Sequence, residues 1–166
     1  MISIRQSVPG DLENIMSLID SGREIMRSDG NVDQWKEGYP KRETVEHDIS
    51  SGNGYLCVEN GVNIGTFAFI AGPDPTYNKI YDGSWTNETL PYHVIHRIAS
   101  TPGSHGVFAA IIGFALQHTN NIRIDTHRDN RIMRYNLTKH GFSYCGIIYL
   151  ANGDERLAFQ LVKADI

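Results

Sequence analysis

The stretch from His96 to Phe142 decides the fold: HRIASTPGSHGVFAAIIGFALQHTNNIRIDTHRDNRIMRYNLTKHGF. It predicts a strand, a glycine turn, an apolar helix, a second strand and a second helix that opens at Asn130 and closes at Gly141. A strand that breaks at a glycine turn into a helix leaves backbone N–H groups unpaired at the positive end of the helix dipole. The sequence therefore predicts a site suited to phosphate at this turn.

The segments outside this stretch predict further strands and helices in the same domain. Alternating apolar residues at 2–6 indicate a first strand, and helical spacing of apolar residues follows after Pro9. A second helix is expected near 42–49, then a hairpin over 55–71, a long loop over 72–91 and a closing hairpin over 143–162. We expect one α/β (α+β) domain spanning residues 1–166, with a single mixed sheet of about seven strands flanked by about four helices.

Composition and charge exclude several function classes. Hydrophobic residues make up 40% of the 166 residues and the net charge is −4, so the chain has no basic footprint for nucleic acid. The longest apolar run, Val107–Leu116, is too short to span a membrane, and the start does not have the layout of a signal peptide. Cys57 and Cys145 lie in apolar runs and are expected to be buried thiols, which fits a reducing cytoplasm. We therefore expect a cytoplasmic protein without a membrane or nucleic-acid partner.

The second helix of the opening stretch carries the most specific pattern. Its residues Asn130-x-x-Met133-x-x-x-Leu137-x-Lys139-x-Gly141-Phe142, placed directly behind the strand IRIDTH, resemble the GCN5-related N-acetyltransferase (GNAT) superfamily. The resemblance covers nearly the full length. It implies the acyl-CoA N-acyltransferase fold, with a mostly antiparallel sheet, and acetyl-CoA as cosubstrate. The implied function is transfer of an acetyl group to a primary amine of a small molecule or a peptide N-terminus by direct attack.

The same resemblance implies where acetyl-CoA would bind. In the superfamily the strand before the glycine turn pairs with the pantetheine arm, and the turn and helix start bind the pyrophosphate. The matching positions here are Ile98, Ala99, Ser100, Gly103, Ser104, His105, Gly106, Val107, Asn130, Met133 and Leu137. Two positions depart from the pattern, since Gly103 stands where Arg or Gln is usual and Phe108 where a small residue is usual. We interpret the Phe108 ring as an obstacle to close approach, and Asn130 as a helix cap, a pantetheine ligand, or both.

Proton transfer needs a group close to the attacking amine. Asp125 in IRIDTH is the preferred base, because it matches the glutamate of L-E-V-R in the ribosomal-protein alanine acetyltransferase branch, and His96 is the second candidate. Either residue has a structural alternative: Asp125 as a strand-end acid and His96 as a hydrogen-bonding strand histidine. The tyrosine that often protonates the leaving thiolate falls on Leu137 here. Another group or water must then protonate the thiolate, or no acid is needed.

The acceptor site is expected among aromatic residues in loops, namely Trp35, Tyr39, Tyr81 and Trp85. Large aromatic side chains wall a pocket or stack on a cation, although the same residues also pin long loops to a core. No metal site is expected, because the chain has no H-E-x-x-H or C-x-x-C spacing. The main alternative function is that of a protein of the same fold that binds or senses acyl-CoA without turnover. The sequence leaves open whether the protein forms a homodimer.

Overall fold

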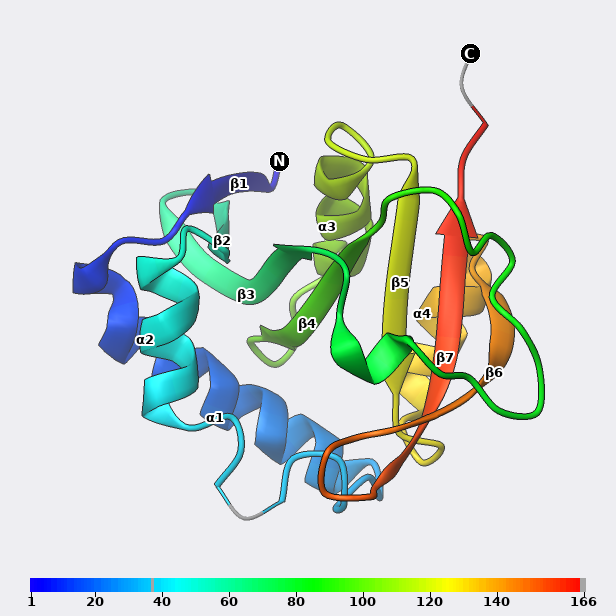
Figure 1. The fold of residues 1–166 in the computed structure, drawn as a ribbon. Coiled ribbons are helices and arrows are strands. Elements are labelled where there is room, and N and C mark those ends of the chain that lie inside the picture. The colour runs from blue at the N-terminus through cyan, green and yellow to red at the C-terminus, as the bar shows by residue number, and fades with distance from the viewer. Residues whose placement is uncertain (37, 165–166) are drawn as a thin grey trace.

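The computed structural model describes residues 1–36 and 38–164, and within them the chain forms a seven-stranded mixed sheet with four α-helices (Figure 1). The strands are β1 (Ser3–Gln6), β2 (Gly54–Glu59), β3 (Val62–Ala71), β4 (His93–Ser100), β5 (Asn121–Thr126), β6 (Ser143–Tyr149) and β7 (Glu155–Val162). The helices are α1 (Leu12–Ser28), α2 (Arg42–Ser50), α3 (Val107–Ala115) and α4 (Arg131–Lys139), with 3₁₀ turns η1 (Pro9–Asp11) and η2 (Pro75–Tyr77). The predicted fold class is confirmed.

The strand order is β1-β2-β3-β4-β5-β7-β6, and β4 with β5 is the parallel pair among otherwise antiparallel neighbours. These two strands pair only at their beginnings, where His93 lies opposite Ile122 and Val94 opposite Arg123. Beyond that point they diverge, as Figure 1 shows. The edge of β4 from Ile95 onward therefore faces a gap in the sheet rather than a neighbouring strand.

A β-bulge sits in the diverging half of β4. The register with β3 shifts between Thr66 and Ala68, and Arg97 has a φ of 56°, in the left-handed region that a non-glycine residue seldom adopts. The guanidinium of Arg97 donates to both carboxylate oxygens of Asp48 on α2, at 2.6 and 2.7 Å. Burial lowers the pKa of Arg97, but Asp48 outweighs that effect and the pKa is raised. This buried ion pair holds the bulge in place.

Three clusters of buried side chains divide the core. The largest packs α3 and α4 against the centre of the sheet, and a second lies beneath α1 and α2. The third lies under the loop 72–92, which crosses the face of β5, β7 and β6 (Figure 1). On α1, Gly22 allows close approach to β4, because an added Cβ would lie 2.8 Å from the Cβ of Ala99. Helix α1 thus lies directly against the diverging strand.

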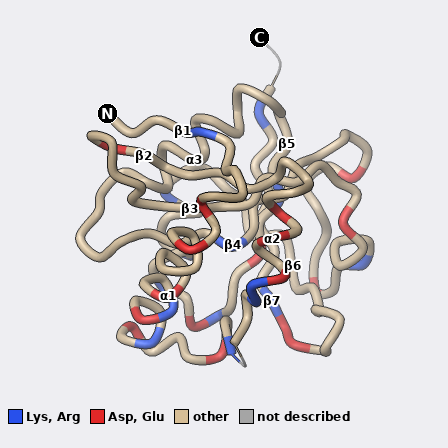
Figure 2. The backbone as a smooth tube through the Cα atoms, turned by 90° about the vertical axis from the view of Figure 1, so that its left-hand side faces the viewer, with Lys and Arg blue, Asp and Glu red and all other residues tan. Residues whose placement is uncertain are grey.

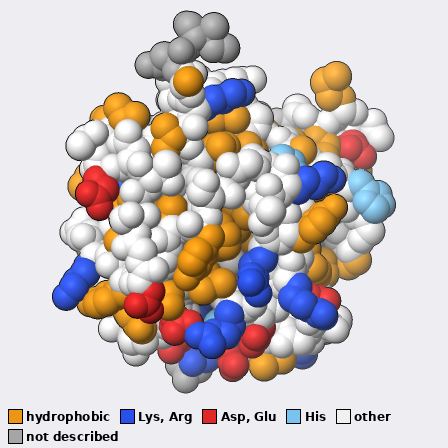
Figure 3. Space-filling model, turned by 90° about the vertical axis from the view of Figure 1, so that its right-hand side faces the viewer, with side chains coloured by type: hydrophobic (Ala, Val, Ile, Leu, Met, Phe, Trp, Pro, Cys, Tyr) orange, Lys and Arg blue, Asp and Glu red, His pale blue; other side chains and the backbone are white. Residues whose placement is uncertain are grey.

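Charged residues of both signs are interspersed along α1 (Figure 2). Ion pairs join Arg23 to Asp20 within this helix, and Arg42 of α2 to Glu13 of α1. Exposed pairs of this kind contribute little to stability, so the apolar cluster beneath α1 and α2 is the main support of their packing. The opposite face, around β6 and α4, shows scattered hydrophobic side chains with charges of both signs toward its lower edge (Figure 3).

Cys57 and Cys145 are both free and buried, which confirms the expected thiols. Burial raises the pKa of the Cys57 thiol to about 12. Each helix within residues 1–36 and 38–164 is too short or too polar to cross a lipid bilayer.

Candidate active site

Two adjoining hollows open where β4 and β5 diverge. We call the first, of about 370 Å³, the turn groove, because the glycine turn and the first turns of α3 and α4 line it. The second, of about 440 Å³, we call the loop cavity, because the α1–α2 loop and the β6–β7 turn form much of its wall. Both hollows are lined by Met26, Ile98, Asn130 and Met133. A molecule lying in one can therefore reach the other at this shared wall.

Most of the residues expected to hold acetyl-CoA line the turn groove. They are Ile98, Ala99, Ser100, Ser104, His105, Gly106, Val107, Asn130 and Met133. Further lining comes from α1 and its C-terminal loop, from Lys139, which belongs to the sequence pattern, and from His140, which does not.

The backbone around the turn groove fits the arm and phosphates of coenzyme A. Along β4 the N–H and C=O groups beyond Val94 have no β5 partner, which leaves an edge to pair with amides. Gly103 and Gly106 have φ values of 75° and 79°, so the turn requires the glycines that the sequence supplies. The first N–H groups of α3 have no partner inside the helix. They lie at the positive N-terminal end of the helix, which lines the groove and suits a phosphate.

Two residues of the expected cofactor pattern do not line the turn groove, and Phe108 lines it with a largely buried ring. Gly103 shapes the turn without lining the groove, and Leu137 is fully buried in the core and lines neither hollow. Phe108 is only 8% exposed, and its ring packs edge-on against His140 with centroids 4.9 Å apart. Phe108 nevertheless lines the turn groove, so the interpretation of its ring as an obstacle to close approach stays a prediction.

Asn130 is tied to the α1–α2 loop as well as to α4. Its Oδ1 accepts the N–H of Met133 at 3.0 Å, which confirms the helix cap, while its Nδ2 donates to Oε1 of Gln34 at 2.9 Å. Gln34 Oε1 also accepts from the Asn31 amide at 3.0 Å and from the Thr126 hydroxyl at 3.3 Å. Gln34 therefore links the α1–α2 loop to the start of α4 at the wall that the two hollows share.

The four aromatic residues expected at the acceptor site separate into two pairs. Trp35 and Tyr39 line the loop cavity. Tyr81 and Trp85 do not: Trp85 is 6% exposed, its Nε1 donates to the backbone oxygen of Tyr77, and its ring lies 4.0 Å from the guanidinium of Arg123. Trp85 thus pins the loop 72–92 to β5, which is the alternative that the sequence left open.

Both candidate bases lie in the loop cavity, and the loop 72–92 brings them partners. Asp74 Oδ2 lies 3.1 Å from Nε2 of His96, while Nδ1 of His96 lies 4.0 Å from Oδ2 of Asp125. The same Asp125 oxygen accepts the hydroxyl of Tyr77 at 2.5 Å. Asp125 and His96 therefore belong to one cluster of titratable groups, with side chains 10% and 23% exposed.

The local environment sets the protonation of the two outer members of this cluster. Burial raises the pKa of Asp74, but hydrogen bonds from His96 and Thr76 outweigh it, and the pKa is lowered to about 2. Burial raises the pKa of Tyr77 well above its usual value, and the nearby Asp125 adds to this. Asp74 is therefore an ionised acceptor for Nε2–H of His96, and Tyr77 is a neutral donor to Asp125.

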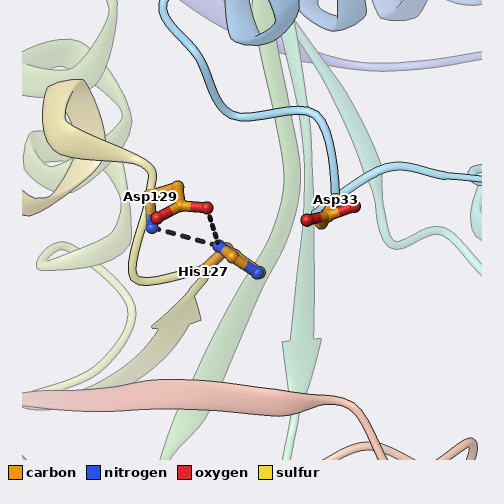
Figure 4. Close-up of side chains that lie close together, drawn as sticks. All are labelled: Asp33, His127 and Asp129. Carbon is orange, nitrogen blue, oxygen red and sulfur yellow. Dashed lines mark hydrogen bonds and ion pairs between the residues drawn. The ribbon is translucent and has the colours of Figure 1, made fainter.

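One set of potential metal ligands lies at the edge of this region. Single ligand atoms of Asp33, His127 and Asp129 fall within 4.8 Å of one another, and Figure 4 shows the three side chains converging from two loops. His127 Nδ1 already accepts the backbone N–H of Asp129 at 3.0 Å, and both aspartates are exposed. We assign no metal to this cluster.

Comparison with known proteins gives the family. No protein-family model and no curated sequence matches the chain. Among solved structures, a GNAT-family acetyltransferase from Streptococcus agalactiae 2603 has a TM-score of 0.90 and 33% identity, covering 99% of this chain and 96% of that one. A GNAT-family acetyltransferase from Listeria monocytogenes 4b F2365 has a TM-score of 0.71 at 19% identity, over 97% and 94% of the two chains. The NatC complex bound to Gag peptide and CoA has a TM-score of 0.61 at 14% identity, over 98% and 99%. The last two show the fold alone, whereas the first shows that this chain belongs to the GNAT family of acetyltransferases.

Proposed function

We propose that this protein transfers the acetyl group of acetyl-CoA to a primary amine of a small molecule or a peptide N-terminus by direct attack. The observation that carries the proposal is the Asp74–His96–Asp125–Tyr77 cluster, of which His96 and Asp125 line the loop cavity that adjoins the turn groove. Acetyl-CoA, held in the turn groove, supplies the acetyl thioester. The amine approaches from the loop cavity, so the two reactants meet where β4 and β5 diverge.

The cluster is arranged to take a proton from the amine. In the tautomer of His96 that donates Nε2–H to Asp74, the lone pair of Nδ1 faces Asp125. The 4.0 Å between Nδ1 and Oδ2 of Asp125 is too long for a direct hydrogen bond, and both atoms are acceptors. An ammonium group or a water molecule between them can donate to both. Asp125 is the proposed base, directly or through water, with His96 as the second group and Asp74 as its positioning residue.

The backbone of β4 is proposed to stabilise the negative charge that develops during the reaction. Negative charge develops on the thioester oxygen as the amine attacks, and unpaired N–H groups of β4 near Ile98 are available to stabilise it. No tyrosine lines the turn groove within residues 1–36 and 38–164, and Tyr135 on α4 is 67% exposed and outside it. Coenzyme A is proposed to leave as a thiolate, which water can protonate. The buried, unpaired cysteines support assignment to the cytoplasm.

The first experiment asks whether coenzyme A binds. A ligand that binds only the native protein raises its melting temperature, so millimolar coenzyme A and acetyl-CoA are expected to give a concentration-dependent increase. The second measurement follows free thiol release with acetyl-CoA and a panel of primary amines and short peptides. Release that depends on an amine supports the enzyme. Binding without release for every amine would favour an acyl-CoA sensor, and no thermal shift at all would overturn the proposal.

A further inference from the structure

A second charged group in the loop cavity has no role in the reaction described so far. Arg156 lies at the start of β7, is 5% exposed and lines the cavity. Its Nη1 donates to the backbone oxygen of Glu155 at 2.9 Å and its Nη2 to that of Gln34 at 3.0 Å. A guanidinium has five N–H donors, and within residues 1–36 and 38–164 this one makes no ion pair and no other hydrogen bond. Arg156 is thus a buried cation without a carboxylate partner.

The carboxylates next to Arg156 in sequence are engaged by other cations. Asp154 pairs with Lys36, at 3.2 Å, and Glu155 pairs with Arg128. The hydrogen bond from Lys36 is the main reason why the pKa of Asp154 is lowered, and Arg156 makes a smaller contribution. Burial lowers the pKa of His127, and the charge of Arg156 is the next cause. The charge of Arg156 therefore lowers the pKa values of Asp154 and His127, but neither residue forms an ion pair with it.

Arg156 faces the same hollow as the proposed base. Strands β5 and β7 lie side by side (Figure 1), and Asp125 is directly opposite Ala158. Arg156 is two residues from Ala158 along β7, so its side chain leaves the sheet on the same face as that of Asp125. Diagonal neighbours of this kind lie about 7–8 Å apart at the backbone. An anion-binding group and a proton acceptor therefore project from neighbouring strands into the same cavity.

Burying an unpaired charge is costly, so a buried charge is normally paired with an opposite charge. We infer that the acceptor is an amine that also carries a carboxylate, as in a free amino acid, and that Arg156 binds this carboxylate while the amine lies between Asp125 and His96. The inference rests on the proposed acetyl transfer and narrows its acceptor. A peptide N-terminus has an amide in place of the carboxylate and would leave Arg156 unpaired. The cavity volume of about 440 Å³ accommodates a single amino acid.

The test compares acceptors that differ only in the carboxylate. Rates of thiol release from acetyl-CoA are measured for leucine and 3-methylbutylamine, histidine and histamine, tyrosine and tyramine, and 4-aminobutyrate and propylamine. The α-amine of an amino acid is less basic than a simple amine, and this difference alone can change the rate. The preference of the parent protein for one acceptor of a pair is therefore not used as the readout. The readout is how the ratio of kcat/KM values within each pair changes between variants, because this ratio does not depend on the fraction of active protein.

Arg156→Met is expected to lower the ratio for the preferred pair by at least about 10-fold, mainly through KM for the amino acid. Arg156→Lys keeps the charge but loses the planar guanidinium. Its ratio is expected to lie between those of Arg156→Met and the parent. Arg27→Met is the control, since Arg27 is an exposed arginine that lines neither hollow. Its ratio should equal that of the parent.

Three outcomes are decisive. A ratio lowered by Arg156→Met and unchanged by Arg27→Met supports the inference. A ratio unchanged by Arg156→Met, or acetylation of peptides and simple amines but of no amino acid, overturns it while the proposed acetyl transfer stands. Failure of the parent to bind acetyl-CoA in a thermal shift overturns both, and this result is read before any acceptor is added.

Discussion

The turn groove and the loop cavity adjoin each other but are built in different ways. The groove is formed largely by one continuous stretch, from β4 through α4, and the groups proposed to bind coenzyme A there are mostly backbone N–H and C=O groups. The cavity is formed by side chains from the α1–α2 loop, η2, β4, β5 and the β6–β7 turn. Backbone groups are supplied by the fold whatever the side chains are, whereas a side-chain cluster depends on each of its members. Substitutions in the two hollows should therefore have different consequences.

The largest effect is expected in the loop cavity, from Asp125→Asn. An amide cannot take the proton from the amine, so kcat should fall about 100-fold or more, with little change in the affinity for coenzyme A. The rate of the variant should rise with pH as the amine in solution loses its own proton. Steady-state kinetics between pH 6 and pH 10, roughly the range that spans histidine and amine titration, measure this. Asp129→Asn, an exposed aspartate that lines neither hollow, is the control. Parent-like rates at every pH would remove Asp125 as the base.

In the turn groove, Phe108→Ala is expected to affect the fold before the chemistry. The ring is buried against His140 and Phe142, so its removal should lower the free energy of unfolding by about 3 kcal/mol. Loss of the packing between α3 and α4 should also weaken coenzyme A binding. Urea denaturation and calorimetric titration measure the two effects. Tyr135→Ala, at a side chain that is 67% exposed, should change neither. Tighter coenzyme A binding in Phe108→Ala would show that the ring does obstruct the groove.

The difference between the hollows also explains how far the sequence could predict them. The order of elements from β4 to α4 follows from local signals, since periodicity marks each element and glycine and asparagine mark the ends. Asn130 caps α4 and Gly141 adopts a φ of 87° after it, both as predicted. Nine of the eleven expected cofactor residues line the groove for the same reason. A site made by consecutive elements can be inferred from consecutive residues.

The loop cavity depends on contacts that have no local signal. Asp74 reaches His96 because the loop 72–92 folds back over β4, and its sequence shows only a long polar and aromatic segment. Trp85, expected at the acceptor site, packs on Arg123 instead, because nothing in a loop sequence indicates which way a ring will turn. Arg156 stands at the start of the final strand ERLAFQLV, where a charge is usually solvent-exposed, and only the register with β5 reveals that it lines the cavity.

A smaller effect is expected from Asp74→Asn, at the partner of the cavity residue His96. An amide no longer holds Nε2–H of His96 with a full negative charge, so kcat should fall about 10-fold and the pH profile should shift. A purely structural role for Asp74 would leave the shape of the profile unchanged. Rescue by Asp74→Glu is a further check, because a carboxylate is retained.

Asp74 also makes a prediction for acid stability. Its pKa in the folded protein is about 2, below the usual value of 3.8, so its contribution to stability is present above pH 3.8 and is lost as the pH falls toward 2. The shift corresponds to about 2 kcal/mol at neutral pH. Urea denaturation at a series of pH values should therefore show that the parent loses more stability than Asp74→Asn in this window. Equal losses in the two proteins would contradict the ionised Asp74.

The smallest effect is expected at the rim of the turn groove, from Lys139→Met. Lys139 is exposed and lines the groove where the phosphates would lie, so removal of its charge should weaken coenzyme A binding by about 3-fold at low salt and less at high salt. Pantetheine, which has no phosphates, should bind the variant and the parent equally. The control is Lys79→Met, since Lys79 also lies over a tyrosine ring but lines neither hollow. If Lys139→Met weakens the binding of pantetheine and of coenzyme A equally, Lys139 supports the groove through packing. A side chain, and not the backbone alone, would then shape the turn groove.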